Sequence, residues 1–286
     1  MKTAPVTSPA FYYNYLKMIR VVNLVIIAIT QYLTAIFLAS PGDNLWAVIS
    51  DKDFFLLVLS TVFIASAGYI INDFYDVKID FVNKPERVVI GKTLSRRWVI
   101  VGQLLLNLLA IGIGFYLSTT IGIINLIAAF SLWIYSNQLK RLPFIGNLII
   151  GGLTGLTVLV VGQYFSERAY LILCYAVFAG FLTLVREIIK DMEDLKGDER
   201  FGCKTLPIVW GIPNTKKFIY LILGLFITTV FLMIWPLSQI LSFTLLGVLI
   251  MLIFMINRAD TVKSYGRLST ICKIIMLLGV SSMVYI

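Results

Sequence analysis

The chain has 286 residues, of which 59% are hydrophobic and 14% charged, and its mean hydropathy is +0.92. These values indicate a polytopic membrane protein and exclude disordered, collagen-like and coiled-coil chains. The absence of histidine excludes Ser-His and Cys-His catalysis and ordinary zinc or haem ligation, so any metal must be held by oxygen. The net charge of +9 fits basic loops on one side of a bilayer better than nucleic-acid binding. Three widely spaced cysteines are expected to be packing residues: Cys174, Cys203 and Cys272.

Nine charge-free apolar runs follow one another along the chain, each of roughly the 20 residues that a helix needs to cross a hydrocarbon core of about 30 Å. They are expected at 21–39, 54–71, 98–117, 121–136, 144–165, 169–185, 218–237, 239–256 and 270–286. The pattern therefore predicts an all-α membrane protein with nine transmembrane helices, forming a single integral membrane domain over residues 1–286.

The basic residues predict how these spans are oriented. All but three of the 24 Lys and Arg residues lie in the N-terminal segment or in the connections after spans two, four, six and eight. The exceptions are Lys52, Arg168 and Lys273, the last of which lies inside the final span. The positive-inside rule therefore places the N-terminus and these four connections in the cytoplasm.

Ten of the fifteen acidic residues lie in only two of these cytoplasmic connections. The first cluster, NDFYDVKID, directly continues span two. Its Asn72, Asp76 and Asp80 are spaced i, i+4, i+8 and are predicted to share one face of a helix, with Asp73 beside Asn72.

The second acidic cluster, REIIKDMEDLKGD, continues span six in the same way. Glu187, Asp191, Asp194 and Asp198 are also predicted to share one helical face. Both clusters contain a DxxxD unit and are separated by four spans, so they emerge on the same side. This arrangement indicates a weak internal repeat of spans 2–5 and 6–9.

Either cluster alone would fit an ordinary solvated face at the end of a membrane helix. The electrostatics of the pair favour another interpretation. Both clusters lie at helix C-termini, where the helix dipole is already negative, and like charges four residues apart repel. A divalent cation would offset these costs, and carboxylates without His or Cys favour Mg²⁺, especially with a phosphate ligand. Together the clusters predict a site for Mg²⁺ and a diphosphate.

Basic residues near the clusters could hold diphosphate oxygens, although anchoring at lipid head groups explains each one equally well. These residues are Arg20, Arg87, Lys140, Arg141, Arg186 and Lys190. Arg20 is accompanied by Asn23, which is polar within an otherwise apolar span and so favours a substrate-binding role. The sequence has no phosphate-binding loop of the P-loop or Rossmann type, so no nucleotide cofactor is indicated.

Four segments resemble the intramembrane UbiA-type prenyltransferase family, in the same order and on nine spans. They are RVVN at 20–23, NDFYDVKIDFVNKPER at 72–87, YSNQLKRLPFIGN at 135–147 and REIIKDMEDLKGD at 186–198. The paired aspartate motifs are the specific part of the resemblance. It implies a helical bundle with a central cavity open to lipid and two Asp-rich cytoplasmic loops. After the first motif the family usually has Arg-Pro and a small hydrophobic residue, whereas here Arg87 is followed by Val88 and Val89.

The resemblance also implies a role for each motif residue, because the family's two motifs bind Mg²⁺ and the diphosphate of a polyprenyl donor. The implied metal ligands are Asn72, Asp76, Asp80, Asp194 and Asp198, assisted by Asp73, Glu187 and Asp191. Asp76 and Asp194 would be central to catalysis, and Arg20, Arg87 and Lys140 would hold phosphate oxygens. Phe74 and Tyr75 are candidates for lining the prenyl cavity.

The second motif and the KTLPIVWG that follows it are most similar to the family branch that prenylates geranylgeranylglyceryl phosphate in ether-lipid synthesis. An aromatic-acid prenyltransferase of quinone biosynthesis is an alternative, and so is the porphyrin-prenylating branch. Two other classes are less well supported. A secondary transporter would carry charges at mid-membrane depth, whereas these spans are almost free of charge. A structural scaffold would need no paired carboxylates.

The expected chemistry needs no nucleophilic side chain. Mg²⁺ and cations neutralise the leaving diphosphate, the allylic C–O bond ionises, and the acceptor traps the carbocation. Glu187 or Asp191 could accept the proton of the acceptor hydroxyl. We therefore expect a Mg²⁺-dependent transferase in the cell membrane of a prokaryote. Its partners are a polyprenyl diphosphate, a lipophilic acceptor and membrane lipid, with no nucleic acid and no obligate protein partner.

Overall fold

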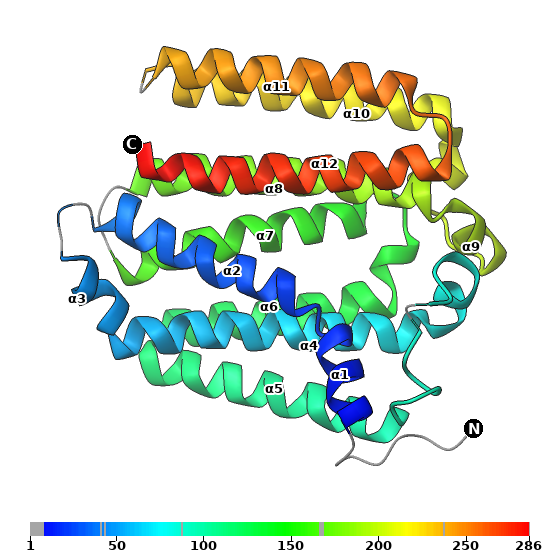
Figure 1. Ribbon diagram of the computed structural model, residues 1–286, viewed down its shortest axis with the longest axis horizontal. Helices are drawn as coiled ribbons and strands as arrows, with labels where there is room; N and C mark the ends of the chain where they lie inside the picture. Colours follow the sequence, from blue (N-terminus) through cyan, green and yellow to red (C-terminus); the bar gives the residue numbers. More distant parts are fainter. Residues whose placement is uncertain are drawn as a thin grey trace. The chain divides into compact units, whose positions relative to one another are not determined.

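The computed structural model describes residues 9–40, 42, 44–86, 88–165, 169–236 and 238–285, and within them the chain is helical apart from turns and one isolated β-bridge (Figure 1). The α-helices are α1 (Pro9–Met18), α2 (Val21–Leu33), α3 (Leu45–Ser50), α4 (Lys52–Asn83), α5 (Arg96–Leu117), α6 (Thr119–Asn137), α7 (Ile145–Tyr164), α8 (Ala169–Glu193), α9 (Leu195–Arg200), α10 (Leu206–Ile234), α11 (Gln239–Arg258) and α12 (Val262–Ser281). A π-helical stretch, Thr34–Ala39, extends α2, and short 3₁₀ turns occupy Leu139–Arg141 and Ser282–Tyr285.

The nine predicted spans are confirmed. Among the described residues, nine helices are long and apolar enough to cross a membrane, with α2 and its π-helical extension counted as one and α12 with its 3₁₀ turn as another. The three cysteines are buried free thiols, as expected of packing residues.

Two helices begin several residues earlier than the spans predicted for them. The seventh span was expected from residue 218, but α10 begins at Leu206 and bends at Gly211, whose φ of 75° is not helical. The ninth span was expected from residue 270, but α12 begins at Val262. In both cases the first turns carry charged residues such as Lys216 and Lys263, so a search for charge-free runs missed them.

The chain divides into two compact units, and each is described by itself. Unit 1 comprises Met1–Ile36 and Ser40–Leu139, and α4 is its central helix, in contact with α2, α5 and α6 (Figure 1). Of the most apolar 18 residues of α4, 56% are buried, against 22% for α5. Buried Asn125 of α6 links three helices, because its side-chain amide donates to Ser60 Oγ at 3.2 Å and to the Ala110 carbonyl at 2.9 Å.

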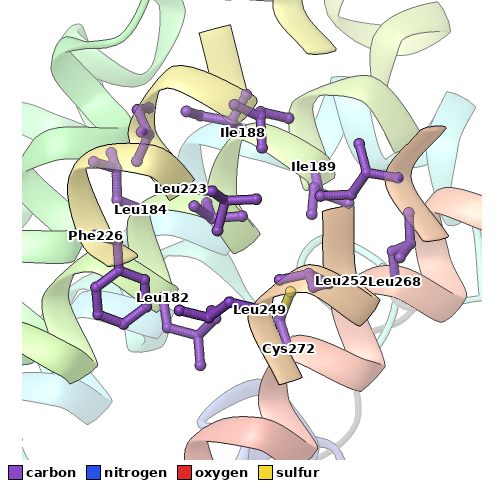
Figure 2. Packing of buried hydrophobic residues seen from close by; sticks show 14 of the residues in the cluster. Leu182, Leu184, Ile188, Ile189, Leu223, Phe226, Leu249, Leu252, Leu268 and Cys272 are labelled. Atoms are coloured by element: carbon purple, nitrogen blue, oxygen red, sulfur yellow. The ribbon is translucent and has the colours of Figure 1, made fainter. Parts of the chain in front are cut away.

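Unit 2 comprises Phe37–Ala39 and Lys140–Ile286, and α8 is its central helix, in contact with α7, α10 and α12. Its core is one apolar cluster to which four helices contribute (Figure 2). The labelled members are Leu182, Leu184, Ile188 and Ile189 of α8, Leu223 and Phe226 of α10, Leu249 and Leu252 of α11, and Leu268 and Cys272 of α12.

Helices α7 and α8 approach each other closely at small residues. A Cβ added at Gly151 would lie 2.9 Å from the carbonyl oxygen of Gly180, and one at Gly155 would lie 2.9 Å from that of Ala176. Membrane helices use such small residues because van der Waals contact between backbones, rather than the hydrophobic effect, drives their association.

Gly151→Ala is therefore expected to lower the free energy of unfolding by about 1–3 kcal/mol, because the new methyl group meets a backbone oxygen that cannot move independently of α8. Thermal unfolding of the purified protein in detergent measures the change. Gly152→Ala is the matched control, since an added Cβ there has no neighbour within 4 Å. Equal melting temperatures for the two variants would contradict close packing at Gly151.

Candidate active site

The first acidic motif forms the last turns of α4 rather than a loop. The helix runs without interruption from the apolar span through Asn72, Asp76 and Asp80 and ends at Asn83, where the Lys84 amide donates to the Asp80 carbonyl at 2.8 Å. The predicted spacing is confirmed, since an unbroken helix keeps these three side chains on one face. The expectation of an Asp-rich loop is wrong here, because the helix continues beyond the apolar residues.

Asp73 is held by a cation from the start of α2. Arg20 Nη2 lies 2.8 Å from Asp73 Oδ1, and the Arg20 guanidinium stands 4.7 Å from the centre of the Tyr69 ring. The Asn23 amide donates to Tyr69 Oη at 3.3 Å. Thus Arg20, Asn23 and Asp73, each predicted as a site residue, lie together. Tyr69 was missed, although it lies one helical turn before Asp73.

Arg20 has a strained backbone conformation in addition to a side chain that is held in place. Its φ of 56° is in the left-handed region that non-glycine residues rarely adopt, at the break between α1 and α2. Burial lowers the pKa of the Arg20 guanidinium, but the charges of Asp73, Tyr69 and Asp80 raise it by more, so this pKa lies above its ordinary value. The Arg20 guanidinium therefore stays positively charged beside Asp73 at physiological pH.

The segment after the first motif is anchored on both sides of Arg87, which itself lies outside the described residues. Lys17 Nζ donates to the Glu86 carbonyl at 3.0 Å, and Lys92 Nζ donates to the Pro85 carbonyl at 3.0 Å. Val88 and Val89 are buried, and Val89 belongs to a small apolar cluster with residues of α1, α4 and α5. Val89 therefore anchors this segment to neighbouring helices, and Val88 beside it is buried.

The two predicted cavity residues, Phe74 and Tyr75, stack edge to face with ring centres 5.6 Å apart. Phe74 also packs against the apolar cluster of this segment and lies 5.7 Å below the guanidinium of Arg96. These contacts support the first motif and its following segment, while a role in lining the prenyl cavity stays a prediction for both residues.

The second motif is broken where a continuous helix was predicted. Helix α8 ends at Glu193, and Asp194, with φ −92° and ψ 5°, caps the short α9. The Asp198 amide donates to the Asp194 carbonyl at 3.2 Å. The expectation of one face shared by Glu187, Asp191, Asp194 and Asp198 is therefore wrong beyond Asp191. The spacing of the acidic residues did not reveal this interruption, because Asp194 and Asp198 are four residues apart, as they would be on one face of a continuous helix.

Glu187 is a buried carboxylate that accepts hydrogen bonds from two cations. Arg186 Nη1 lies 2.9 Å from its Oε1, and Lys190 Nζ lies 2.9 Å from Oε2 and 3.2 Å from Oε1. The exposed fraction of the Glu187 side chain is only 9%. Both of its oxygens are thus engaged, and Lys190, predicted to bind substrate, is held beside it.

Asp191 is held by α7. The Asn147 side-chain amide donates to Asp191 Oδ2 at 2.8 Å, and Asn147 is itself buried. Asn147, Gly151 and Gly155 follow one another at intervals of four on α7, so the glycine contacts with α8 set the distance at which the amide reaches the carboxylate. The sequence carried a signal for Asn147, a polar residue at the start of an apolar span, but gave it no role.

Lys140 and Arg141 lie in the 3₁₀ turn before α7. The Arg141 carbonyl accepts from the Lys204 amide at 2.7 Å, which ties this turn to the segment that follows α9. Lys140 is half-buried and Arg141 is exposed. Both predicted phosphate-binding residues therefore belong to the unit that carries the second motif.

Neither motif gathers three Asp, Glu or Cys side chains around one point within the part of the chain that the structure describes. The donors that each motif offers are carboxylate and amide oxygens, which suit Mg²⁺. Protein sites for Mg²⁺ commonly use one or two carboxylates and complete the coordination with water and substrate phosphate. The donor set therefore fits a Mg²⁺ ion that binds together with a diphosphate.

Known proteins resemble this chain in sequence and in fold. The UbiA prenyltransferase family model matches residues 28–276. The digeranylgeranylglyceryl phosphate synthase of Saccharolobus solfataricus is 30% identical over 276 residues, 93% of this chain and 94% of that protein. The protein of the same name from Methanobrevibacter smithii is 37% identical over 69% of each chain, and that from Thermococcus sibiricus is 40% identical over 57% of this chain and 58% of the other.

Solved structures share the fold. A structure that concerns digeranylgeranylglyceryl phosphate synthase in membranes has a TM-score of 0.72 at 24% identity and covers 96% of this chain and 97% of its own. A UbiA homolog from Archaeoglobus fulgidus, bound to DMAPP and Mg²⁺, has a TM-score of 0.64 at 16% identity, covering 94% of this chain and 99% of its own.

The fold and its spans define an all-α, multi-pass integral membrane protein. The chain belongs to the UbiA prenyltransferase family, which makes it an enzyme that transfers prenyl groups.

The Asn147–Asp191 contact yields a stability prediction. Asn147→Leu is expected to lower the free energy of unfolding by about 1–3 kcal/mol, because it removes the donor from an oxygen of the half-buried Asp191 carboxylate. Asn147→Leu with Asp191→Leu should restore most of the loss, since no polar group is then left unsatisfied. Thermal unfolding of both variants in detergent tests this, and a double variant that is as unstable as the sum of its parts would argue against a direct interaction.

Proposed function

We propose that this enzyme transfers a geranylgeranyl group from its diphosphate to geranylgeranylglyceryl phosphate, an ether-lipid precursor. The observation that carries the proposal is the pair of carboxylate motifs in a chain that aligns over 93% of its length with a digeranylgeranylglyceryl phosphate synthase. The names of the other relatives point to the same acceptor.

Mg²⁺ fits the oxygen donors of the two motifs, and when bound it would neutralise the diphosphate as it leaves. The residues proposed to hold it are Asn72, Asp73, Asp76 and Asp80 of the first motif and Asp194 and Asp198 of the second. The cations proposed to bind the diphosphate or the other substrate are Arg20, Arg87, Lys140, Arg141 and Lys190, with Asn23 as an amide donor. Support comes from the fixed position of Arg20 beside Asp73 and from the family relationship.

Asp191 is the better placed of the two carboxylates proposed to accept the acceptor's hydroxyl proton. Glu187 already accepts from Arg186 and Lys190 with both oxygens, so its negative charge is committed to two cations. Asp191 has one oxygen fixed by the Asn147 amide, which orients the carboxylate. A base held in this way can receive a proton without reorganising the side chains around it.

The enzyme is proposed to form a single domain in the cell membrane of a prokaryote, with a prenyl cavity open to lipid and no obligate protein partner. The distribution of basic residues supports placing the N-terminus and both motifs on the cytoplasmic side. A hydrophobic donor and acceptor can then reach the enzyme from the bilayer while the diphosphate remains at the aqueous side.

The deciding experiment is transfer of labelled geranylgeranyl diphosphate by the purified protein in lipid, with and without Mg²⁺. The acceptor panel consists of geranylgeranylglyceryl phosphate, 4-hydroxybenzoate and dihydroxynaphthoate. Mg²⁺-dependent labelling of the glycerol phosphate supports the proposal. Labelling of an aromatic acid alone would move the enzyme to quinone synthesis, and no Mg²⁺-dependent transfer at all would reject the proposed reaction.

Asp76→Asn with Asp194→Asn is expected to reduce turnover at least about a hundredfold, because each substitution removes a charged ligand while conserving side-chain size. Asp53→Asn is the matched control, since Asp53 is an exposed carboxylate at the opposite end of α4 and its loss should leave turnover unchanged. Steady-state transfer and melting temperature are measured together. Near-normal turnover in the double variant would exclude a role for these carboxylates.

A further inference from the structure

A positive charge lies near the middle of the ninth span. Helix α12 crosses with its 3₁₀ turn from Val262 to Tyr285, and Lys273 lies at the centre of this range. A lysine this far from both ends of a span is costly in hydrocarbon, and such residues generally face the protein interior and take part in function.

Lys273 lies opposite Arg186 on the central helix of unit 2. Helices α8 and α12 pack antiparallel, as Thr183 contacts Met276 at 3.8 Å and Tyr175 contacts Ser282 at 2.9 Å. Three residues beyond Thr183 is Arg186, and three residues before Met276 is Lys273. These contacts place Arg186 and Lys273 at the same level of the two helices.

The surroundings of this pair favour an anion. Arg186 donates to Glu187, yet its Nε is buried and has no hydrogen-bond partner among the described residues. Lys190 adds a third positive charge and shares the same carboxylate. The neighbouring Ile189 and Cys272 belong to the apolar core of the unit (Figure 2). Glu187 offsets part of this positive charge, and a multiply charged anion would relieve the remaining repulsion between the cations.

We propose that Arg186, Lys190 and Lys273 form a binding site for the phosphate of the acceptor's glycerol phosphate head group. This inference rests on the proposed function, which supplies the acceptor. A phosphate monoester carries close to two negative charges and three acceptor oxygens at neutral pH. A guanidinium binds such a group through two parallel N–H donors, and a lysine adds a point charge.

The donor's diphosphate offers the same chemistry, but its position differs. Asp194, proposed to hold the donor's Mg²⁺, follows Arg186 by eight residues, which is about 12 Å along a helix. Lys273 lies opposite Arg186 and so is equally far from the end of α8. Arg186 and Lys273 therefore lie deeper in the span than Asp194, as a separate anion site requires, and Lys190 lies between the two levels.

The test combines removal of the Lys273 charge from the protein with removal of the phosphate group from the acceptor. The kcat/KM of the full-length enzyme in lipid is measured for geranylgeranylglyceryl phosphate and for geranylgeranylglycerol, which lacks the phosphate. The natural enzyme is expected to prefer the phosphate at least about tenfold, the effect of one charge-assisted hydrogen bond. In Lys273→Met this preference should fall close to one, while the KM for geranylgeranyl diphosphate stays within about twofold. Lys273→Arg should keep most of the preference.

Lys263→Met is the matched control, because it removes an exposed charge from the same helix and should behave as the natural enzyme. An equal loss with both acceptors would show that Lys273 is only structural, and a raised donor KM would assign the cluster to the diphosphate; either result overturns the inference.

Binding of geranylgeranylglyceryl phosphate without donor separates this inference from the proposed function. If the natural enzyme binds this lipid but transfers nothing to it, the proposed reaction fails, and at least about tenfold weaker binding by Lys273→Met would still support the anion site. If the natural enzyme does not bind the lipid, or Lys273→Met binds it equally well, the anion site is rejected.

Discussion

Helix α4 is one unbroken helix that contains both an apolar membrane span and the polar residues of the first motif. Its apolar turns pack against α2, α5 and α6, and its last turns carry Asn72, Asp76 and Asp80. Because the backbone hydrogen bonds of a membrane helix cannot be exchanged for water, the packing of the span fixes the rotation of the whole helix. That rotation decides where the carboxylates project. The metal ligands proposed for the first motif are therefore positioned by residues such as Leu57 and Ile64, buried several turns away.

The carboxylates lie where a helix alone would disfavour them, at C-terminal ends, and the structure shows how the charge is compensated. Arg20 reaches Asp73 from a strained backbone conformation at the start of α2. On α8, Glu187 is enclosed by Arg186 and Lys190. These contacts neutralise some acidic residues within each motif. A cation that arrives with substrate would compensate further negative charge, as expected of a site that binds Mg²⁺ mainly through phosphate.

The sequence was sufficient for what depends on local periodicity and hydropathy. All nine spans follow from apolar runs, and the shared face of Asn72, Asp76 and Asp80 follows from their spacing. The break at Asp194 did not follow, because a helix cap and a helix interior can have the same spacing of acids. Contacts such as Asn147–Asp191 and Thr183–Met276 depend on which helices become neighbours, and hydropathy carries no information about that.

The distance between α7 and α8 is set by glycine residues rather than by large side chains. In a bilayer, apolar side chains gain little by exchanging contact with lipid for contact with another helix. A close approach of helices therefore depends on contact between their backbones. Gly151 and Gly155 allow α7 to touch α8, and on the same stripe Asn147 reaches Asp191. A larger residue at either glycine would separate the helices along their length and lengthen the polar contact at their end. The geometry of the carboxylate thus depends on two residues that have no side chain.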